Sequence, residues 1–181
     1  MTSPFSPVWI ASRHLARRVA ALGVGAGSAT VASFVAGLAA MPLLALRHYW
    51  PGLTLIVAAR AISLLALAMR RSEGDAPSAG LAAAFDPIVF AGVPFAFALA
   101  DPSRALAAAF LLFAFVAAGA AGLTIAAKRG IAAIDETICL AAFAFACVVP
   151  DRFSIVAYAL GVAGFIAAGA RIASGLARSG S

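Results

Sequence analysis

The chain has 181 residues, of which 64% are hydrophobic and only 11% are charged. Soluble domains are about 45–50% apolar and about 25% charged, so this composition excludes an ordinary soluble globular protein. The uncharged runs from Val19 to Leu46 and from Ala105 to Ala127 exceed the roughly 20 residues that a helix needs to cross a bilayer. The composition therefore predicts an all-α, polytopic membrane protein.

The net charge of +6 would suggest a nucleic-acid partner in a soluble chain, but the distribution of the basic residues argues against one. Once the apolar segments are laid out, nine of the thirteen Lys and Arg residues fall on one side of the membrane. This positive-inside pattern predicts a bacterial inner-membrane protein with both termini in the cytoplasm. Because aromatic and basic residues do not alternate as they do in nucleic-acid-binding surfaces, we expect membrane lipids and no nucleic acid as partners.

The first predicted element, residues 1–22, is a basic N-terminal segment. Within it, Val8 to Leu22 sets Trp9 and other apolar residues against three arginines, which predicts an amphipathic helix at the anionic cytoplasmic interface. The glycine-rich stretch from Gly23 to Gly27 ends this helix.

Six transmembrane helices are predicted within residues 23–175, followed by a short tail at residues 176–181. The spans are Gly27 to Leu46, Gly52 to Met69, Leu81 to Ala100, Ala105 to Ala127, Ile131 to Val149 and Phe153 to Ala173. An even number of spans agrees with both termini on one side. The longest connection, Arg70 to Gly80, concentrates Gly, Pro, Ser and charges and is predicted to be a cytoplasmic loop.

Ionisable side chains inside the spans are the candidates for function, because one at the centre of a span costs about 2.5–3.5 kcal/mol on insertion scales. They are Arg60, Asp86, Asp135, Glu136 and Arg171. Counted from the cytoplasmic end at about 1.5 Å per residue, opposite charges lie at compatible depths, which indicates a polar cavity open to that leaflet. Alternatively, the acids stand near helix N-termini, where the helix dipole favours them, and share no site.

The third and fourth predicted spans resemble part of a known family. The block from Phe85 to Gly130, which begins FDPIVFAGVPFAFALADPSR, is similar to a stretch of bacterial CDP-alcohol phosphatidyltransferases. The similarity extends to Asp135-Glu-Thr-Ile138, to the pair Arg171 and Ile172, and to Val31-Ala-Ser-Phe34. This resemblance covers most of the chain and implies six spans, cytoplasmic termini and a homodimer.

Members of that family transfer a phosphoalcohol or phosphatidyl group from a CDP-linked donor to an alcohol and release CMP. Four Asp residues hold the divalent metals that neutralise the pyrophosphate, and one carboxylate takes the proton of the acceptor. Anchored on Arg60, the resemblance places Ser63 and Ala66 at the first two Asp positions. It places Asp86 at the third and Phe90 at the fourth, so one of four acids remains.

The loss of these acids predicts that the family's catalysis is absent. Bound Mg²⁺ is normally held by one or two carboxylates together with substrate phosphates, so a single carboxylate does not hold a metal pair. No His, Cys and acid cluster elsewhere in the sequence has metal-ligand spacing. We therefore expect no cofactor and no metal, with Mg²⁺ or Mn²⁺ needed only if the protein is active.

Three functions remain open from the sequence. The first is a catalytically degenerate protein that holds a lipid headgroup or phosphate in a basic cytoplasmic cavity, or that serves as an inactive partner of an active paralogue. Its predicted ligand-binding residues are Arg60, Arg70, Arg71, Glu136 and Arg171. The second is a working transferase that uses Asp86 with unconventional metal ligands. The third is a ligand-free membrane scaffold.

Overall fold

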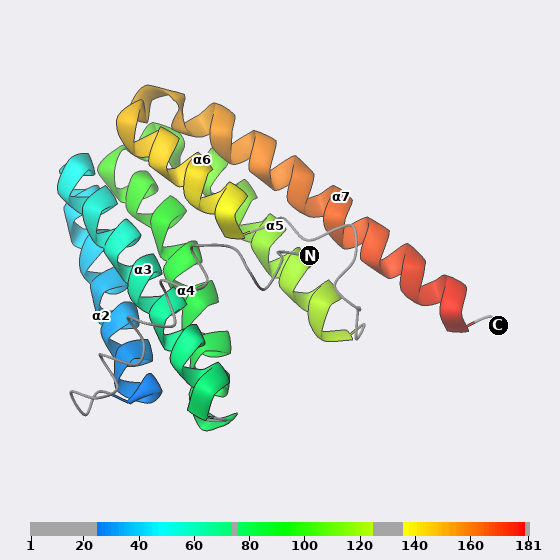
Figure 1. The fold of residues 1–181 in the computed structure, drawn as a ribbon. Coiled ribbons are helices and arrows are strands. Elements are labelled where there is room, and N and C mark those ends of the chain that lie inside the picture. Colours follow the sequence, from blue (N-terminus) through cyan, green and yellow to red (C-terminus); the bar gives the residue numbers. More distant parts are fainter. Residues whose placement is uncertain (1–24, 74–75, 125–135, 180–181) are drawn as a thin grey trace. The chain divides into compact units, whose positions relative to one another are not determined.

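The computed structural model describes residues 25–73, 76–124 and 136–179, and the regular structure of these residues is helical throughout (Figure 1). The six α-helices in this part of the chain are α2 (Ala26–Ala45), α3 (Tyr49–Glu73), α4 (Ala76–Ala100), α5 (Ala105–Thr124), α6 (Glu136–Val148) and α7 (Phe153–Ser179). Short 3₁₀ helices, η1 (Pro102–Arg104) and η2 (Pro150–Arg152), precede α5 and α7. The prediction of an all-α chain is confirmed. The predicted N-terminal amphipathic helix lies outside the described residues.

Four of the described helices are long and apolar enough to cross a bilayer. These segments are Ala26–Ala45, Tyr49–Arg70, Pro102–Gly119 and Pro150–Ala170, and they overlap the first, second, fourth and sixth predicted spans. The other two predicted spans contain the shorter apolar segments Phe85–Ala100 and Thr137–Val148. The high apolar content thus takes the form of membrane-length helices.

The prediction of a loop from Arg70 to Gly80 is wrong in its extent. Helix α3 continues to Glu73 and α4 begins at Ala76, so the connection is much shorter. Pro77 falls in the first turn of α4, where its missing N–H costs no helical hydrogen bond. Pro51 likewise lies in the first turn of α3, so this helix starts before the predicted Gly52.

Contacts divide the chain into two compact units, whose boundary passes through α2, α3 and α4. The first comprises residues 1–43 and 51–90, and the second comprises residues 44–50 and 91–181. In the first unit, buried side chains of α2 and α3 form a core cluster of Ala26, Ala29, Ala66 and Met69. On α2, Gly37 faces Val89 of α4 so closely that an added Cβ would lie 2.8 Å from both Val89 methyl carbons. Small residues therefore allow close helix approach in this unit.

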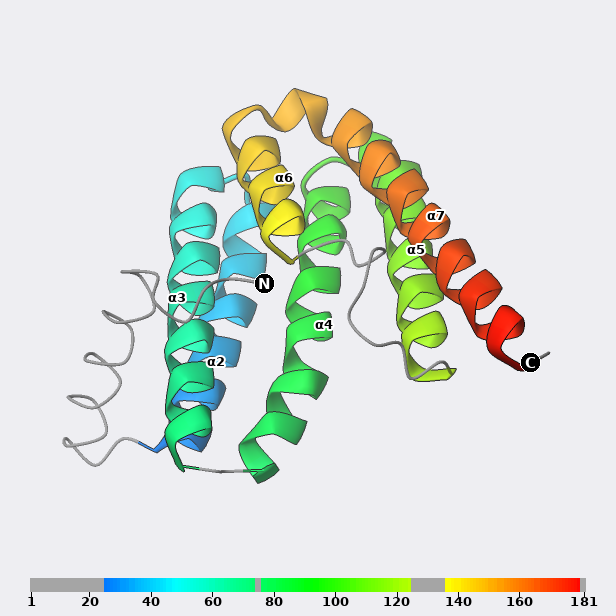
Figure 2. The ribbon, with the colours of Figure 1, turned by 45° about the vertical axis from the view of Figure 1, so that its right-hand side comes forward.

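In the second unit, α5 lies along α7, as both ribbon views show (Figures 1 and 2). An aromatic stack also forms, because the Phe97 ring lies 5.4 Å from that of Tyr49 and 4.4 Å from that of Phe153, centroid to centroid. Phe97 and Phe153 are fully buried. This stack joins the start of α3, the last turns of α4 and the start of α7.

Candidate functional site

Arg60 of α3 and Asp86 of α4 face each other within the first unit. Nη1 of Arg60 lies 3.9 Å from Oδ2 of Asp86, and the two side chains are 18% and 33% exposed. Both residues stand in apolar helices, where a charge is retained by pairing with an opposite one. The structure thus brings together two charges that the sequence placed at compatible depths.

Phe90 adds an aromatic contact to this pair. The centre of the Arg60 guanidinium lies 6.0 Å from the centroid of the Phe90 ring, at the outer limit of a cation–π interaction. Because Phe90 follows Asp86 by four residues, both project from one face of α4. Helix α4 therefore presents a carboxylate and a ring to the same guanidinium.

Two hydroxyl groups of α2 form hydrogen bonds with α3 on either side of Arg60. Arg70 donates from Nη1 to Oγ1 of Thr30 at 3.2 Å, and Thr30 donates to the Ala26 carbonyl at 2.9 Å. Ser33 donates to the carbonyl of Ala59, the residue before Arg60, at 2.8 Å. The charge of Arg70 also attracts the Asp86 carboxylate. The Asp86 carboxylate is thus half-buried and has the described charges of Arg60 and Arg70 acting on it.

The remaining predicted site residues are placed only by their helices. Arg71 lies near the end of α3, Glu136 opens α6, and Arg171 lies in α7. Their side chains, and the whole of Asp135, lie outside the described residues.

The position that the resemblance gives to the second Asp is part of the hydrophobic core. Ala66 is 1% exposed and packs with Ala26, Ala29 and Met69. A methyl group there contributes to packing between α2 and α3. It offers no oxygen to a metal.

The described residues around Asp86 do not fit a pair of divalent metals. Such cations take oxygen ligands, chiefly carboxylates. Among the side chains that the structure describes, no group of three or more His, Cys, Asp or Glu residues is arranged to hold a metal ion. Within the described part of the chain, the guanidinium groups of Arg60 and Arg70 act on the Asp86 carboxylate, and both repel a cation.

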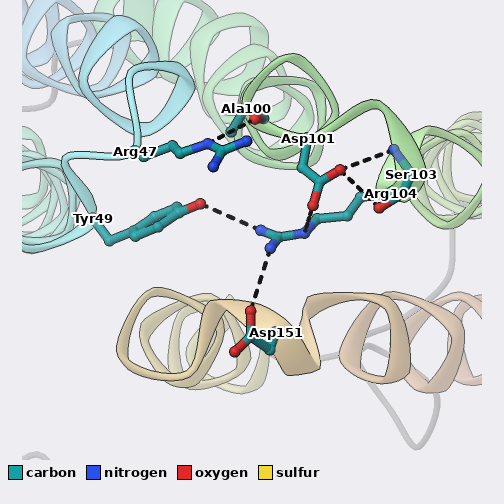
Figure 3. Close-up of polar contacts among 7 residues, drawn as sticks. All are labelled: Arg47, Tyr49, Ala100, Asp101, Ser103, Arg104 and Asp151. Carbon is teal, nitrogen blue, oxygen red and sulfur yellow. Dashed lines mark hydrogen bonds and ion pairs between the residues drawn. The ribbon is translucent and has the colours of Figure 1, made fainter.

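A second polar cluster, the Arg104 cluster, lies in the second unit and consists of Arg47, Tyr49, Asp101, Arg104 and Asp151 (Figure 3). The Arg104 side chain is 12% exposed, and its Nε lies 3.2 Å from Asp101 Oδ2. Its Nη2 lies 3.7 Å from Asp151 Oδ1, and its Nη1 donates to the Tyr49 hydroxyl at 3.3 Å. One guanidinium thus links the start of α3 with the α4–α5 and α6–α7 connections.

Asp101 also caps η1. Its Oδ1 accepts hydrogen bonds from the Ser103 backbone N–H at 3.0 Å and from the Ser103 hydroxyl at 2.7 Å. These bonds, with the nearby Arg104 and Arg47 charges, hold the pKa of Asp101 below its ordinary value because they stabilise the carboxylate. Arg47 has a φ of 63° and donates from Nε to the Ala100 carbonyl at 3.0 Å.

The Arg104 cluster was not predicted from the sequence, although one of its signals is local. An Asp before a Pro, with Arg three residues later, is the pattern of a capped turn with an ion pair. The contacts of Arg104 with Tyr49 and Asp151 join distant segments. No local pattern predicts them.

No protein-family profile matches the chain. The inner membrane protein YnjF of Escherichia coli (strain K12) is 40% identical over 108 residues, which cover 58% of this chain and 52% of YnjF. The matched part therefore spans about half the length of this relative.

The structure resembles the crystal structure of Mycobacterium tuberculosis phosphatidylinositol phosphate synthase (PgsA1) with CDP-DAG bound. The TM-score is 0.72 at 20% sequence identity, with 89% of this chain and 91% of that chain covered. At this identity the likeness concerns the fold alone. Together with the four membrane-length helices and the inner-membrane relative, it shows a helical membrane protein that shares the fold of a phosphatidylinositol phosphate synthase.

Proposed function

We propose that this protein is a catalytically degenerate member of the CDP-alcohol phosphatidyltransferase family that binds a phosphate-bearing group, such as a lipid headgroup, beside Arg60. It lies in the bacterial inner membrane with six spans and both termini in the cytoplasm. The shared fold and the resemblance of Phe85 to Gly130 to that family support the assignment.

The observation that carries the proposal is the partner of Asp86. In the family's reaction, carboxylates hold divalent ions that neutralise a pyrophosphate. Here the Asp86 carboxylate faces the Arg60 guanidinium at 3.9 Å, while Ala66 lies in the core. Because Asp86 neutralises the charge of Arg60, its carboxylate is not available as a metal ligand. The positive charges beside it attract an anion and repel a metal ion.

The helix ends support the proposed orientation. Helix α3 runs beyond its apolar part into Arg70 and Arg71, and α7 runs beyond Ala170 through Arg171 and Arg178. Basic residues at the ends of spans favour the cytoplasmic side. The Arg60 site then opens toward the leaflet in which CDP-linked lipids are used by the family.

A direct assay tests the loss of catalysis. The purified full-length protein is incubated with Mg²⁺ or Mn²⁺, CDP-diacylglycerol and a panel of acceptor alcohols, and CMP is quantified beside M. tuberculosis phosphatidylinositol phosphate synthase as the positive control. We expect no CMP above the protein-free background. CMP release that Asp86→Ala abolishes would instead establish an active transferase, the second candidate function, which the retained Asp86 favours.

Selective retention of ligand tests the binding half of the proposal. After purification in mild detergent, phosphorus analysis and lipid mass spectrometry should show a phosphate-bearing ligand that Arg60→Gln loses. Equal retention by the wild type and the variant would favour the ligand-free scaffold.

A further inference from the structure

We infer that Arg60 is the built-in counter-ion of Asp86, so that the site binds a phosphate group without a divalent cation, and that Asp86 competes with this phosphate for Arg60. The inference rests on the proposed function and specifies its ligand chemistry and its control. The ligand is a phosphate monoester or diester, whether carried by a lipid headgroup or free in solution.

The spacing of the Arg60–Asp86 pair is that of a loose contact. Charge-assisted hydrogen bonds between guanidinium and carboxylate groups are about 2.7–2.9 Å long, whereas Nη1 of Arg60 and Oδ2 of Asp86 are 3.9 Å apart. The Asp86 side chain is also one-third exposed. A contact of this length with a partly solvated carboxylate is readily exchanged for a closer anion.

A phosphate group suits Arg60 better than Asp86 does at this distance. Arginine presents a planar fork of N–H donors that matches two oxygens of a phosphate. The Phe90 ring, 6.0 Å from the guanidinium, provides an apolar wall beside Arg60. A phosphate that forms a bidentate pair with Arg60 would therefore displace the Asp86 carboxylate.

The same surroundings disfavour a metal-bridged complex. A divalent ion beside Asp86 would stand next to the Arg60 guanidinium and within the field of Arg70. Among the described side chains, an anion in that place is attracted by both arginines and repelled by Asp86. Removing the Asp86 charge should therefore tighten phosphate binding, which is the opposite of what a metal-dependent site predicts.

The test is a titration of the delipidated full-length protein with phosphatidylglycerol, followed by native mass spectrometry in EDTA and again in Mg²⁺. We expect Asp86→Asn to bind about three- to fivefold more tightly, the size of a lost weak ion pair. Arg60→Gln should bind at least about tenfold more weakly, and Arg60→Lys should be intermediate because it keeps the charge without the fork. Mg²⁺ should leave all affinities unchanged.

The exposed residues Asp151 and Arg152 supply matched controls. Asp151→Asn and Arg152→Gln change the same charges and should leave the affinity at the wild-type value. Thermal unfolding of each variant separates lost binding from lost folding, and Arg60→Lys keeps the test decisive if Arg60→Gln does not fold.

Competition with inorganic phosphate identifies the source of the ligand. Displacement of phosphatidylglycerol by millimolar phosphate supports recognition of the phosphate alone, and retention supports recognition of the lipid. Weaker binding by Asp86→Asn, or binding that requires Mg²⁺, overturns the inference while leaving a non-catalytic binding protein in place. CMP release in the transferase assay overturns the proposed function itself.

Discussion

Arg104 and Tyr49 lie 55 positions apart in the sequence, and Nη1 of Arg104 donates a 3.3 Å hydrogen bond to the Tyr49 hydroxyl. The Tyr49 ring stacks on Phe97 at the same time. Tyr49 thus belongs both to the polar Arg104 cluster, through its hydroxyl, and to the aromatic stack, through its ring. A substitution that removes only the hydroxyl separates the two contributions.

Tyr49→Phe should lower the melting temperature in detergent, because it removes the hydroxyl and keeps the ring. A hydrogen bond to a charged donor contributes about 1.5–3 kcal/mol, which corresponds to a shift of roughly 3–12 °C in a chain of this size. Tyr158→Phe is the control, since the Tyr158 hydroxyl makes no hydrogen bond within the described part of the chain while its ring contacts Phe110. Equal shifts for the two variants would show that the Tyr49 hydroxyl contributes nothing specific.

Protonation of Asp101 should lower the thermal stability of the protein at acid pH. Its pKa is lower in the folded protein than in the unfolded chain, chiefly because Ser103 donates two hydrogen bonds to the carboxylate. The stabilisation is therefore complete above the unfolded pKa of about 3.9 and is lost as the pH falls through the lower folded pKa. Melting curves from pH 7 to pH 3 should show a smaller acid loss for Asp101→Asn than for the wild type. Parallel curves would contradict this assignment.

Gly161→Ala should destabilise the packing of α7 on α5. A Cβ at Gly161 would lie 2.5 Å from Cε1 and 2.6 Å from Cδ1 of the Phe110 ring, so the ring must move. Overpacking of this kind costs about 1–3 kcal/mol. Gly169→Ala on the same helix is the matched control, because no described atom from outside its own stretch of helix would lie within 4 Å of the added Cβ. Thermal unfolding should distinguish the two variants, and equal stability would rule out a tight contact at Phe110.

Ser33→Ala should weaken the contact between α2 and α3 by about 0.6 kcal/mol and by no more than about 1.7 kcal/mol, the average and the maximum found for hydrogen bonds between membrane helices. The substitution removes the donor to the Ala59 carbonyl. Ser28→Ala serves as the control, because the exposed Ser28 hydroxyl donates only to Gly25, three residues earlier. A larger loss for Ser28→Ala than for Ser33→Ala in chemical unfolding would contradict this account of the interface.

The helical elements could largely be predicted from the sequence, because apolar runs of membrane length leave few alternatives. The starts of α5 at Ala105 and α7 at Phe153 agree with the prediction. The predicted loop failed at Pro77, since a proline reads as a break in a sequence but fits the first turn of a helix.

The part of the candidate site that depends only on how deep each charged residue lies in its span could be predicted. Arg60 and Asp86 must each find a partner in an apolar helix, and their positions along α3 and α4 bring them together. The other contacts depend on how far each helix is rotated about its own axis, which residue spacing does not give. For this reason neither the contact of Phe90 with Arg60 nor that of Thr30 with Arg70 could be predicted. The Arg104 cluster depends on three connections meeting, which no local pattern encodes.

The role of Asp86 as a counter-ion to Arg60 is tested most directly by Mn²⁺ binding, measured by electron paramagnetic resonance. Titration of the purified wild type should show no stoichiometric bound Mn²⁺ beyond that of Asp86→Asn. Arg60→Gln removes the guanidinium, so it would bind Mn²⁺ if that charge were all that keeps the metal away from Asp86. We expect it to bind no more Mn²⁺ than the wild type, because the described part of the site also lacks the other metal ligands. Stoichiometric Mn²⁺ on the wild type that disappears in Asp86→Asn would show instead that Asp86 is a metal ligand.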